Sequence, residues 1–326
     1  MSDFLIDLLL YGNVVSLGFT LLLVVYLIMK QRIQTAEEKE VRAYLHENQG
    51  NWNDFFFYLQ QVPKGLIPRN PQEVTAVERI FHAYLRNVSN PMLRDKVQQF
   101  SNQYLSTYYR RQLHHRKWSL RVNTLHRIAD YQITSLLDDC RLMADGRVSE
   151  EEAFDLLYIF SIMDEQAFLE KLPRLSKEFT EFEWKKILLS LKPQLFGQMV
   201  DRVGEWPKRC VYSIIDIIGI RKKLLLIPVL EDFLSSQDAE ERIRALKAIN
   251  EIGVAGELGK YLHLLESPVW EERLMTARLL KHFPLSQTRS YLERLGDDES
   301  WWVRREALGV LGAQDQSDSR SAVARR

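Results

Sequence analysis

The sequence has no excess of either charge, because 44 Lys and Arg residues are matched by 44 Asp and Glu residues. Dedicated nucleic-acid binders normally carry a basic excess, so this class of function is disfavoured. Cysteine is scarce: Cys140 and Cys210 lie far apart, and neither belongs to a metal-ligand spacing. A disulfide framework is therefore unsupported, which suits a reducing compartment.

Motifs that carry chemistry are also missing. The sequence holds no phosphate-binding loop, nucleophile elbow or dinucleotide fingerprint. Its histidines form no metal spacing, and the adjacent His114 and His115 would point apart on a helix. We therefore expect no catalytic residue, no cofactor and no metal ion, and we favour a binding protein over an enzyme.

Helix signals dominate what is present. There is no strand-like alternation, whereas capping residues and first-turn prolines recur along the chain. The capping boxes expected are Thr35 with Glu38, Ser149 with Glu152, and Thr180 with Glu183, and the capped prolines are Pro71, Pro91 and Pro268. We predict an all-α protein with helices of roughly 10 to 20 residues and short loops.

A long apolar run lies near the N-terminus. From Leu8 to Met29 the chain has 22 residues without a charge, and about 20 cross the bilayer core as a helix. Asp3 and Asp7 precede the run without any Lys or Arg, and no small-residue cleavage site follows, which disfavours a cleaved signal peptide. We predict a transmembrane helix over residues 8–29.

The charges flanking this run predict its orientation. No basic residue precedes it, whereas Lys30, Arg32, Lys39 and Arg42 follow it. Lys and Arg stay preferentially on the cytoplasmic side. We therefore predict a single-pass protein of the cell membrane, with residues 1–7 outside and the bulk of the chain in the cytoplasm.

One face of the predicted span carries small and polar residues. Gly12, Ser16 and Thr20 recur every four residues, with Asn13 beside them. Small residues let a second helix approach closely, and a buried Asn can bond across the contact. Two interpretations stay open: pairing with another transmembrane helix, including that of a homo-oligomer, or simple tolerance of these residues near the outer interface.

The C-terminal half repeats every 31 residues, as Arg242, Arg273 and Arg304 show. Apolar residues keep the same step in five further sets: Leu246, Ala277 and Leu308; Ala248, Leu279 and Val310; Ile249, Leu280 and Leu311; Leu230, Tyr261 and Leu292; and Phe233, Leu264 and Leu295. Such a period is typical of a solenoid, because one helix pair alone cannot bury both apolar faces.

These units resemble the HEAT-repeat family in its short bacterial form, within the HEAT and PBS-lyase-like helical repeat superfamily. Residues 227–234 look like the first helix of the family, and residues 242–249 and 303–308 look like its second. The resemblance is clearest over residues 205–312 and implies an α-solenoid of antiparallel helix pairs. It also implies that the periodic arginines are structural and pair with acidic or carbonyl groups across the stack.

A Trp-x-x-Arg spacing extends the pattern towards the N-terminus, because Trp118 and Arg121 match Trp270 and Arg273. We predict a repeat array over residues 113–312 that loses its regularity between about 150 and 205. Residues 30–112 are expected to form a helical juxtamembrane module. The polar residues 313–326 have little to bury and are expected to be a disordered tail.

The densest basic segment contains Arg110, Arg111, Arg116 and Lys117, with aromatic residues on both sides. Such a segment can contact anionic lipid headgroups, each basic residue contributing about 1 kcal/mol. It can also grip a nucleic acid, although the balanced charge and the predicted anchor make that partner the least favoured. A solvated helix end together with one core tryptophan, Trp118, is the simplest interpretation and stays open.

The second helices of the predicted repeats offer a candidate partner surface. Lys247 and Arg278 lie one period apart outside the apolar sets, and Lys281, Trp302 and Arg305 lie near them in sequence. A basic groove with an aromatic side chain would suit an acidic peptide or helix. An ordinary solvated face is the alternative for each of these residues.

The interpretation that accounts for most of the chain is a membrane-tethered scaffold that presents a cytoplasmic repeat surface to a protein partner at the membrane. An envelope-biosynthesis complex would be one setting, by analogy alone. Two alternatives belong to other classes: a HEAT-like enzyme of the lyase type, and a regulatory subunit that senses a lipid or a ligand.

Overall fold

The computed structural model describes residues 2–87 and 90–324, with the side chains of residues 16–87 and 90–315. Within these residues every regular element is helical and no strand occurs, so the all-α prediction is confirmed. The chain forms two compact units, Met1–Asp145 and Gly146–Arg326. The boundary between them lies about one helix pair beyond residue 113, where we placed the start of the array.

The first unit is built around one very long helix. Its α-helices are α1 (Ser2–Phe57), α2 (Pro71–Asn87), α3 (Pro91–Phe100), α4 (Ser106–Leu113), α5 (Trp118–Tyr131) and α6 (Leu137–Asp145). A π-helical turn, η2 (Ser101–Leu105), joins α3 to α4, and short 3₁₀ turns lie at η1 (Lys64–Leu66) and η3 (Thr134–Leu136).

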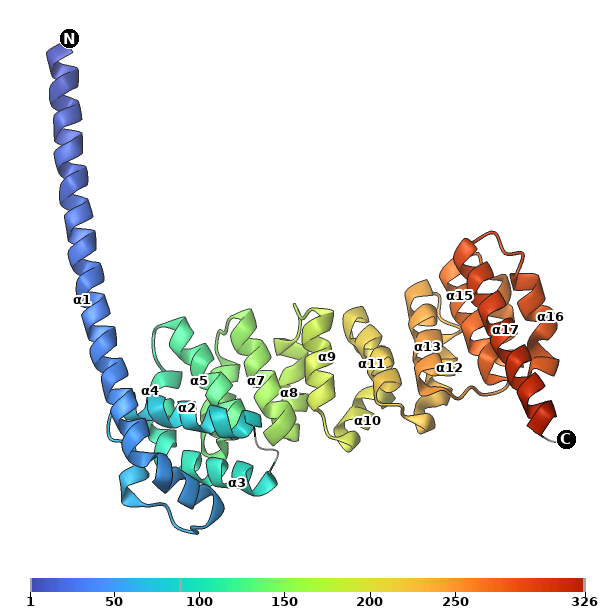
Figure 1. Cartoon of the computed structure of the whole chain (residues 1–326), viewed down its shortest axis with the longest axis horizontal. Coiled ribbons are helices and arrows are strands. Elements are labelled where there is room, and N and C mark those ends of the chain that lie inside the picture. Colours follow the sequence, from blue (N-terminus) through green and yellow to red (C-terminus); the bar gives the residue numbers. More distant parts are fainter. Residues whose placement is uncertain (1, 88–89, 325–326) are drawn as a thin grey trace. The chain divides into compact units, whose positions relative to one another are not determined.

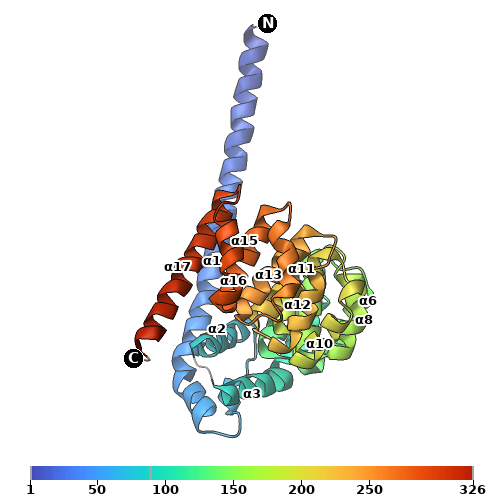
Figure 2. The same cartoon turned by 90° about the vertical axis from the view of Figure 1, so that its right-hand side faces the viewer.

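Helix α1 has an exposed apolar part and a buried part. Its 56 residues make it about 80 Å long at 1.5 Å per residue. The helix is long and apolar enough to cross a membrane, and none of its most apolar window is buried. Figures 1 and 2 show this part extending beyond the other helices of its unit. It therefore does not belong to the core of the first unit.

The C-terminal part of α1 carries an aromatic core. Trp52 is 1% exposed, and its ring centroid lies 5.4 Å from that of Phe81 in α2 and 5.1 Å from that of Phe100 in α3. The Tyr44 hydroxyl donates to the Leu66 carbonyl at 2.8 Å. Aromatic pairs at these distances stabilise beyond their buried area, so these contacts fix the C-terminal part of α1 to the first unit.

The predicted helix start at Thr35 is wrong. The Thr35 hydroxyl donates to the Gln31 carbonyl, four residues back within α1, at 2.8 Å. Glu38 accepts from Arg79 of α2 and from Arg42 instead of completing a capping box. A Thr hydroxyl can bond to the preceding turn of a helix, so the same residue suits an interior position as well as a cap.

The second unit contains eleven α-helices in its described residues. They are α7 (Glu150–Met163), α8 (Glu165–Leu175), α9 (Glu181–Ser190), α10 (Pro193–Asp201), α11 (Lys208–Ile220), α12 (Ile227–Phe233), α13 (Ala239–Ile252), α14 (Gly259–Leu262), α15 (Trp270–Leu279), α16 (Leu285–Leu295) and α17 (Trp301–Ala324). Short 3₁₀ turns lie at η4 (Val203–Glu205), η5 (Leu224–Leu226), η6 (His263–Glu266) and η7 (Leu280–His282).

Alternate helices of this unit pack in a row. Helices α7, α9, α11, α13, α15 and α17 each contact the next, and Figure 1 shows them in chain order. They begin at residues 150, 181, 208, 239, 270 and 301, which gives steps of 31, 27, 31, 31 and 31. The helical architecture is consistent with an α-solenoid, and it continues through the stretch from 150 to 205 where we expected regularity to fail.

Most of the periodic apolar residues form the core of this unit. Leu246, Ala277, Leu279, Leu280 and Leu292 are all fully buried. Leu308 differs, because it is 55% exposed although it keeps the 31-residue step. Its helix, α17, is the last of the row in the described residues.

The local capping predictions mostly hold. Ser149 with Glu152 and Thr180 with Glu183 form capping boxes, and Asn90 caps α3. Ser267 is different, because α15 begins at Trp270 with Val269 as its N-cap. The Ser267 hydroxyl accepts from the Val269 amide and so shapes the turn before the helix.

Candidate partner-binding groove

A groove of about 550 Å³ lies between α15 and α17 in the second unit. Apolar groups and glycine form part of its lining, and three cationic side chains surround them. The lining residues are Leu274, Arg278, Lys281, Trp302, Arg305, Glu306, Gly309, Val310, Ala313 and Gln314. The groove thus combines an apolar surface with positive charge, the combination needed for an acidic amphipathic segment.

Four of the five residues in the predicted partner surface line this groove, namely Arg278, Lys281, Trp302 and Arg305. The fifth, Lys247, is exposed on α13 and does not line it. Arg278 and Lys247 occupy equivalent places one period apart, but the hollow forms where α17 supplies Trp302 and Arg305. The sequence period therefore related Arg278 to Lys247, whereas this groove is lined by residues of α15, η7 and α17.

Among the side chains that the structure describes, Glu306 is the one acidic residue in the lining, and it is paired. Arg278 donates to its two carboxylate oxygens at 2.8 and 3.0 Å. These hydrogen bonds lower the pKa of Glu306 despite its partial burial, and Lys281 and Arg305 act in the same direction. With Arg278 and Glu306 compensating each other, Lys281 and Arg305 leave the groove with a positive excess.

Trp302 belongs to a small aromatic group at the start of α17. Its ring lies 4.7 Å from that of Trp301 in a T-shaped arrangement, and the two rings are 55% and 50% exposed. The Arg305 guanidinium lies 5.1 Å from the Trp301 ring. Trp and Arg are the side chains most enriched at energetically important interface positions, so this end of the groove has the composition of a binding surface.

The periodic arginines fix the helices that form the groove. The guanidinium Nη1 of Arg242, Arg273 and Arg304 donates to the carbonyl six residues earlier, at 2.6, 2.7 and 2.7 Å. Arg121 makes the same contact in the first unit, to His115 at 3.0 Å. Each arginine thereby closes the turn that precedes its own helix, which explains why an arginine recurs at this position.

Two of these arginines also donate to a carboxylate of the next helix pair in the row. Arg242 donates to the Glu272 carboxylate at 2.6 Å, and Arg273 donates to Asp298 at 2.7 and 2.8 Å. The structural role that the family resemblance implied for them agrees with these contacts, since both acidic and carbonyl partners are present.

The chain after Gly312 starts as helix rather than as a disordered tail. Helix α17 continues to Ala324, and the Gln314 amide donates to the carbonyl oxygens of Lys281 and Phe283 at 3.3 and 2.9 Å. These two hydrogen bonds tie α17 to the turn after α15. Residues 325 and 326 of the predicted tail lie outside the described part of the chain.

The basic segment of the first unit is partly neutralised. Arg110 and His114 both lie within hydrogen-bonding distance of Asp139, at 3.0 and 3.3 Å. Burial would raise the pKa of Asp139, but these two hydrogen bonds outweigh it and leave the pKa lowered. Arg111, Arg116 and Lys117 are exposed on the surface. Of the predicted lipid-contact residues, three therefore remain available to solvent and one forms an ion pair.

The small and polar face of α1 is described only in part. Ser16 and Thr20 are exposed, and the Thr20 hydroxyl donates to the Ser16 carbonyl within the helix at 2.8 Å. The side chains of Gly12 and Asn13 lie outside the described residues. The pairing hypothesis therefore stays a prediction.

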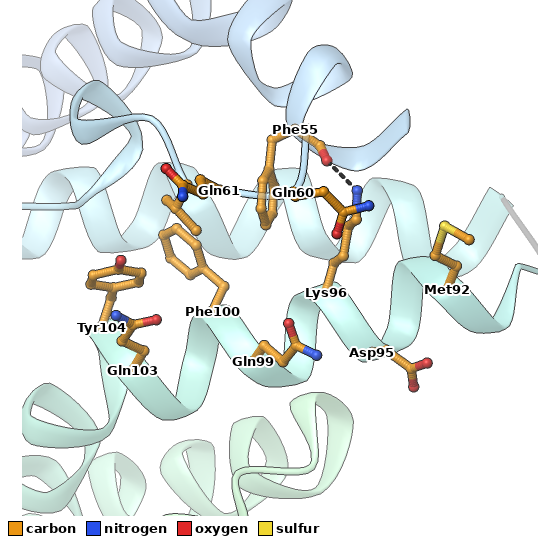
Figure 3. Close-up of a pocket in the computed structure, with 11 residues that line it drawn as sticks. Phe55, Gln60, Gln61, Met92, Asp95, Lys96, Gln99, Phe100, Gln103 and Tyr104 are labelled. Carbon is orange, nitrogen blue, oxygen red and sulfur yellow. Dashed lines mark hydrogen bonds between the residues drawn. The ribbon is translucent and has the colours of Figure 1, made fainter. Parts of the chain in front are cut away.

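A second cavity, of about 510 Å³, lies beside α3 in the first unit. Figure 3 shows Lys96 within it, pointing at the Phe55 carbonyl, among several glutamines. The Lys96 ammonium donates to the carbonyl oxygens of Phe55, Phe56 and Leu59 at 2.6, 3.2 and 2.8 Å. All three of its donors are used at the C-terminal end of α1, so Lys96 caps a helix here.

Neither reactive cysteines nor metal ligands gather in the described residues. Cys140 and Cys210 are free and fully buried, and burial raises the pKa of Cys140 to about 12. A buried thiol in this state is a poor nucleophile. Among the side chains of residues 16–87 and 90–315, no group of three His, Cys, Asp or Glu residues could hold a metal ion.

Comparison with known proteins gives no family. No protein-family model matches the sequence, and no curated protein matches it. Two crystal structures of engineered proteins from the Northeast Structural Genomics Consortium share 15% and 13% identity with the chain, at TM-scores of 0.26 and 0.32. They cover 64% and 77% of this chain, and 96% and 82% of their own chains are covered. At these TM-scores the likenesses carry no argument about fold or function.

Proposed function

We propose that the chain is a membrane-anchored scaffold that binds an acidic, amphipathic segment of a protein partner in the groove between α15 and α17. The observation that carries the proposal is the convergence of Arg278, Lys281, Trp302 and Arg305 around one apolar hollow. The sequence gives no catalytic constellation that would compete with a binding role.

The repeat units support this role. We propose that the second unit is a HEAT-type α-solenoid, because its alternate helices pack in a row at steps close to 31 residues and carry the family's arginine pattern. Solenoids present extended surfaces on which partner segments bind. A groove formed by two successive second helices fits that use.

The exposed part of α1 supports the membrane location. Its apolar side chains lie outside the core of their unit, with Leu22 at 71% and Phe19 at 69% exposure. Apolar surface of this extent requires another apolar environment, and the uncharged run matches the thickness of a bilayer. With basic residues only after the run, the domains would lie in the cytoplasm. Confinement to the membrane plane would raise the local concentration of a partner that is also there.

The groove suits an occupant with both charge and an apolar face. Leu274, Val310 and Ala313 offer apolar contact, while Lys281 and Arg305 attract carboxylates. An acidic partner group could also compete with Glu306 for Arg278, because that ion pair is partly exposed. Charge complementarity of this kind raises association rates and sets specificity more than affinity.

The test is site-specific photo-cross-linking of the full chain in its native membrane. A small photoreactive residue with a short diazirine side chain replaces Gly309, whose Cβ position has nothing within 4 Å and which lines the groove. The control replaces Lys247, which is exposed outside the groove. We expect a discrete partner to be cross-linked from position 309 and not from position 247.

Charge reversal tests whether the partner binds in the groove or elsewhere on the surface. Lys281→Glu combined with Arg305→Glu should abolish the cross-link from position 309, whereas Lys247→Glu should leave it intact. Thermal unfolding of each variant checks that the fold is retained. Cross-linking that persists in the double variant, or that is equally strong from position 247, would refute the assignment of the groove.

A further inference from the structure

The turn between α11 and α12 exposes an apolar tip next to two lysines. Leu225 is 93% exposed, more than any other large apolar side chain in the described residues, and Leu224 is 55% exposed. Lys222 and Lys223 directly precede them and are also exposed. No acidic residue lies between Ile220 and Val229 in the sequence. The tip therefore combines projecting leucines with uncompensated positive charge.

The backbone of this turn is fixed. The Lys223 amide donates to the Ile218 carbonyl at 3.3 Å, and the Lys222 amide donates to the Gly219 carbonyl at 3.0 Å. This pair of bonds is a Schellman motif, in which Lys222 has a φ of 49° at the position usually held by Gly. A left-handed backbone conformation costs free energy for a lysine, so Gly would be the more stable residue at position 222.

Arg221 attaches the turn to the neighbouring helix. Its guanidinium donates to the carbonyl oxygens of Leu188, Leu189 and Leu191 at 2.8, 3.0 and 3.0 Å. It also lies 4.6 Å from the Phe196 ring. Arg221 is thus used inside the unit to cap α9, and Lys222 and Lys223 are the charges left facing outward.

The first unit contains the same turn with a different tip. After α5 the amides of Gln132 and Ile133 donate to Ala129 and Ile128 at 3.3 and 3.1 Å, and Gln132 has a φ of 51°. A 3₁₀ turn follows in both cases, η3 there and η5 here. In the first unit the exposed tip of the turn consists of Thr134 and Ser135. The second unit has Leu224 and Leu225 at the equivalent positions. The turn itself therefore does not require leucine at these positions.

We propose that the tip formed by Lys222, Lys223, Leu224 and Leu225 inserts into an anionic lipid surface. A side chain as exposed as Leu225 projects from the surface instead of lining a groove. A bilayer can accept the leucines among its acyl chains and the lysine ammonium groups among its phosphates. Two weak signals of different kinds, apolar and electrostatic, together give stable attachment. The proposal rests on the membrane location proposed above.

The experiment uses the full chain in vesicles and one environment-sensitive label. Leu225→Cys is labelled with a nitrobenzoxadiazole dye, which the fully buried Cys140 and Cys210 cannot compete for. The vesicles contain phosphatidylcholine with or without phosphatidylserine. With phosphatidylserine we expect a blue shift of the emission and loss of quenching by aqueous iodide. Lys222→Gly with Lys223→Ser should remove both effects, and Gly suits the left-handed backbone at 222.

Labels at two control positions show whether a change at position 225 comes from the tip or from the anchor. Ser135→Cys places the dye at the equivalent tip of the first unit and should stay quenched by iodide in both vesicles. Leu22→Cys reports on α1 and should be protected in both, so its exposure would indicate failure of the anchor and not of the tip. With position 22 protected, a dye at 225 that iodide reaches in phosphatidylserine vesicles would overturn the proposal. Equal protection in neutral vesicles would also overturn it, because the lysines would then have no part.

Discussion

Arg242 and Glu272 form an ion pair in which the carboxylate is almost completely buried. Glu272 is 1% exposed, and both the Nε and Nη2 of Arg242 donate to its Oε1, at 3.0 and 2.6 Å. The same guanidinium holds the Ser236 carbonyl at 2.6 Å. One side chain thus closes the turn between α12 and α13 and links α13 to α15.

The periodic arginines should therefore differ in what they contribute to stability. Arg242→Ala would leave a buried carboxylate without its cation, which costs about 3–5 kcal/mol of unfolding free energy. Arg304 donates to the carbonyl oxygens of Asp298 and Glu299, and no hydrogen bond from it to a carboxylate is present in the described residues. Arg304→Ala should accordingly cost about 1–3 kcal/mol. Urea unfolding of the full chain in detergent micelles measures both, and equal losses would contradict the argument.

Stability in acid should depend on Asp238. Hydrogen bonds from Lys208 and Tyr212 lower the pKa of Asp238 to about 2, and its carboxylate also caps α13 through the Glu240 amide. A carboxyl whose pKa falls on folding stabilises above its unfolded pKa, near 3.9, and this contribution is lost as the pH falls through about 2.

Asp238→Asn isolates that contribution, because Asn still caps a helix N-terminus. We expect the variant to lose of the order of 1 kcal/mol at pH 6, since an exposed lysine partner is screened by water. The difference from the native chain should shrink as the pH falls from about 4 to about 2. Urea midpoints at several pH values test this, and a difference that does not change with pH would exclude the linkage.

Anchoring by α1 has a direct biochemical consequence. Leu22→Lys with Val25→Lys places two charges in the predicted span, each costing about 2.5–3.5 kcal/mol at the bilayer centre. The native chain should resist extraction from membranes by alkaline carbonate, whereas the variant should be released. Because the buried core at Trp52 and Phe56 lies more than five turns away, the unfolding transition of the domain should be unchanged. Release of the native chain by carbonate would rule out a transmembrane α1.

Features set by neighbouring residues were predictable from the sequence. The capping boxes at Ser149 and Thr180 were found because a side chain and an amide three residues apart decide them. Thr35 shows the limit of that signal, since the same residue types also occur inside a helix. In the structure Glu38 pairs with Arg79 of α2, and α1 runs through Thr35 without a break.

Features set by packing were only partly predictable. The row of helices continues through α7 and α9, although neither carries the Trp-x-x-Arg spacing, because buried apolar side chains such as Phe160 and Ile187 are enough to keep it. The sequence period related Arg278 to Lys247 and suggested Trp302 only as a nearby candidate, whereas the groove gathers Arg278 with Trp302 and leaves Lys247 outside. The run Arg221-Lys222-Lys223-Leu224-Leu225-Leu226 is visible in the sequence, yet its significance depends on exposure.

Two glycines of the second unit should respond to alanine in opposite directions. At Gly219 an added Cβ would lie 2.8 Å from the Ala248 Cα and 2.9 Å from its Cβ, so α11 and α13 would have to move apart. At Gly309 the same Cβ meets nothing within 4 Å in the middle of α17. Gly219→Ala should therefore destabilise by about 1–3 kcal/mol through overpacking.

Gly309→Ala should stabilise by about 0.5–1 kcal/mol through helix propensity alone. We expect Gly309→Ala to raise the urea midpoint. The bulkier Gly309→Trp should block cross-linking from a small photoreactive residue at Ala313, which also lines the groove. If Gly309→Trp left that cross-link unchanged, the partner would not enter the groove.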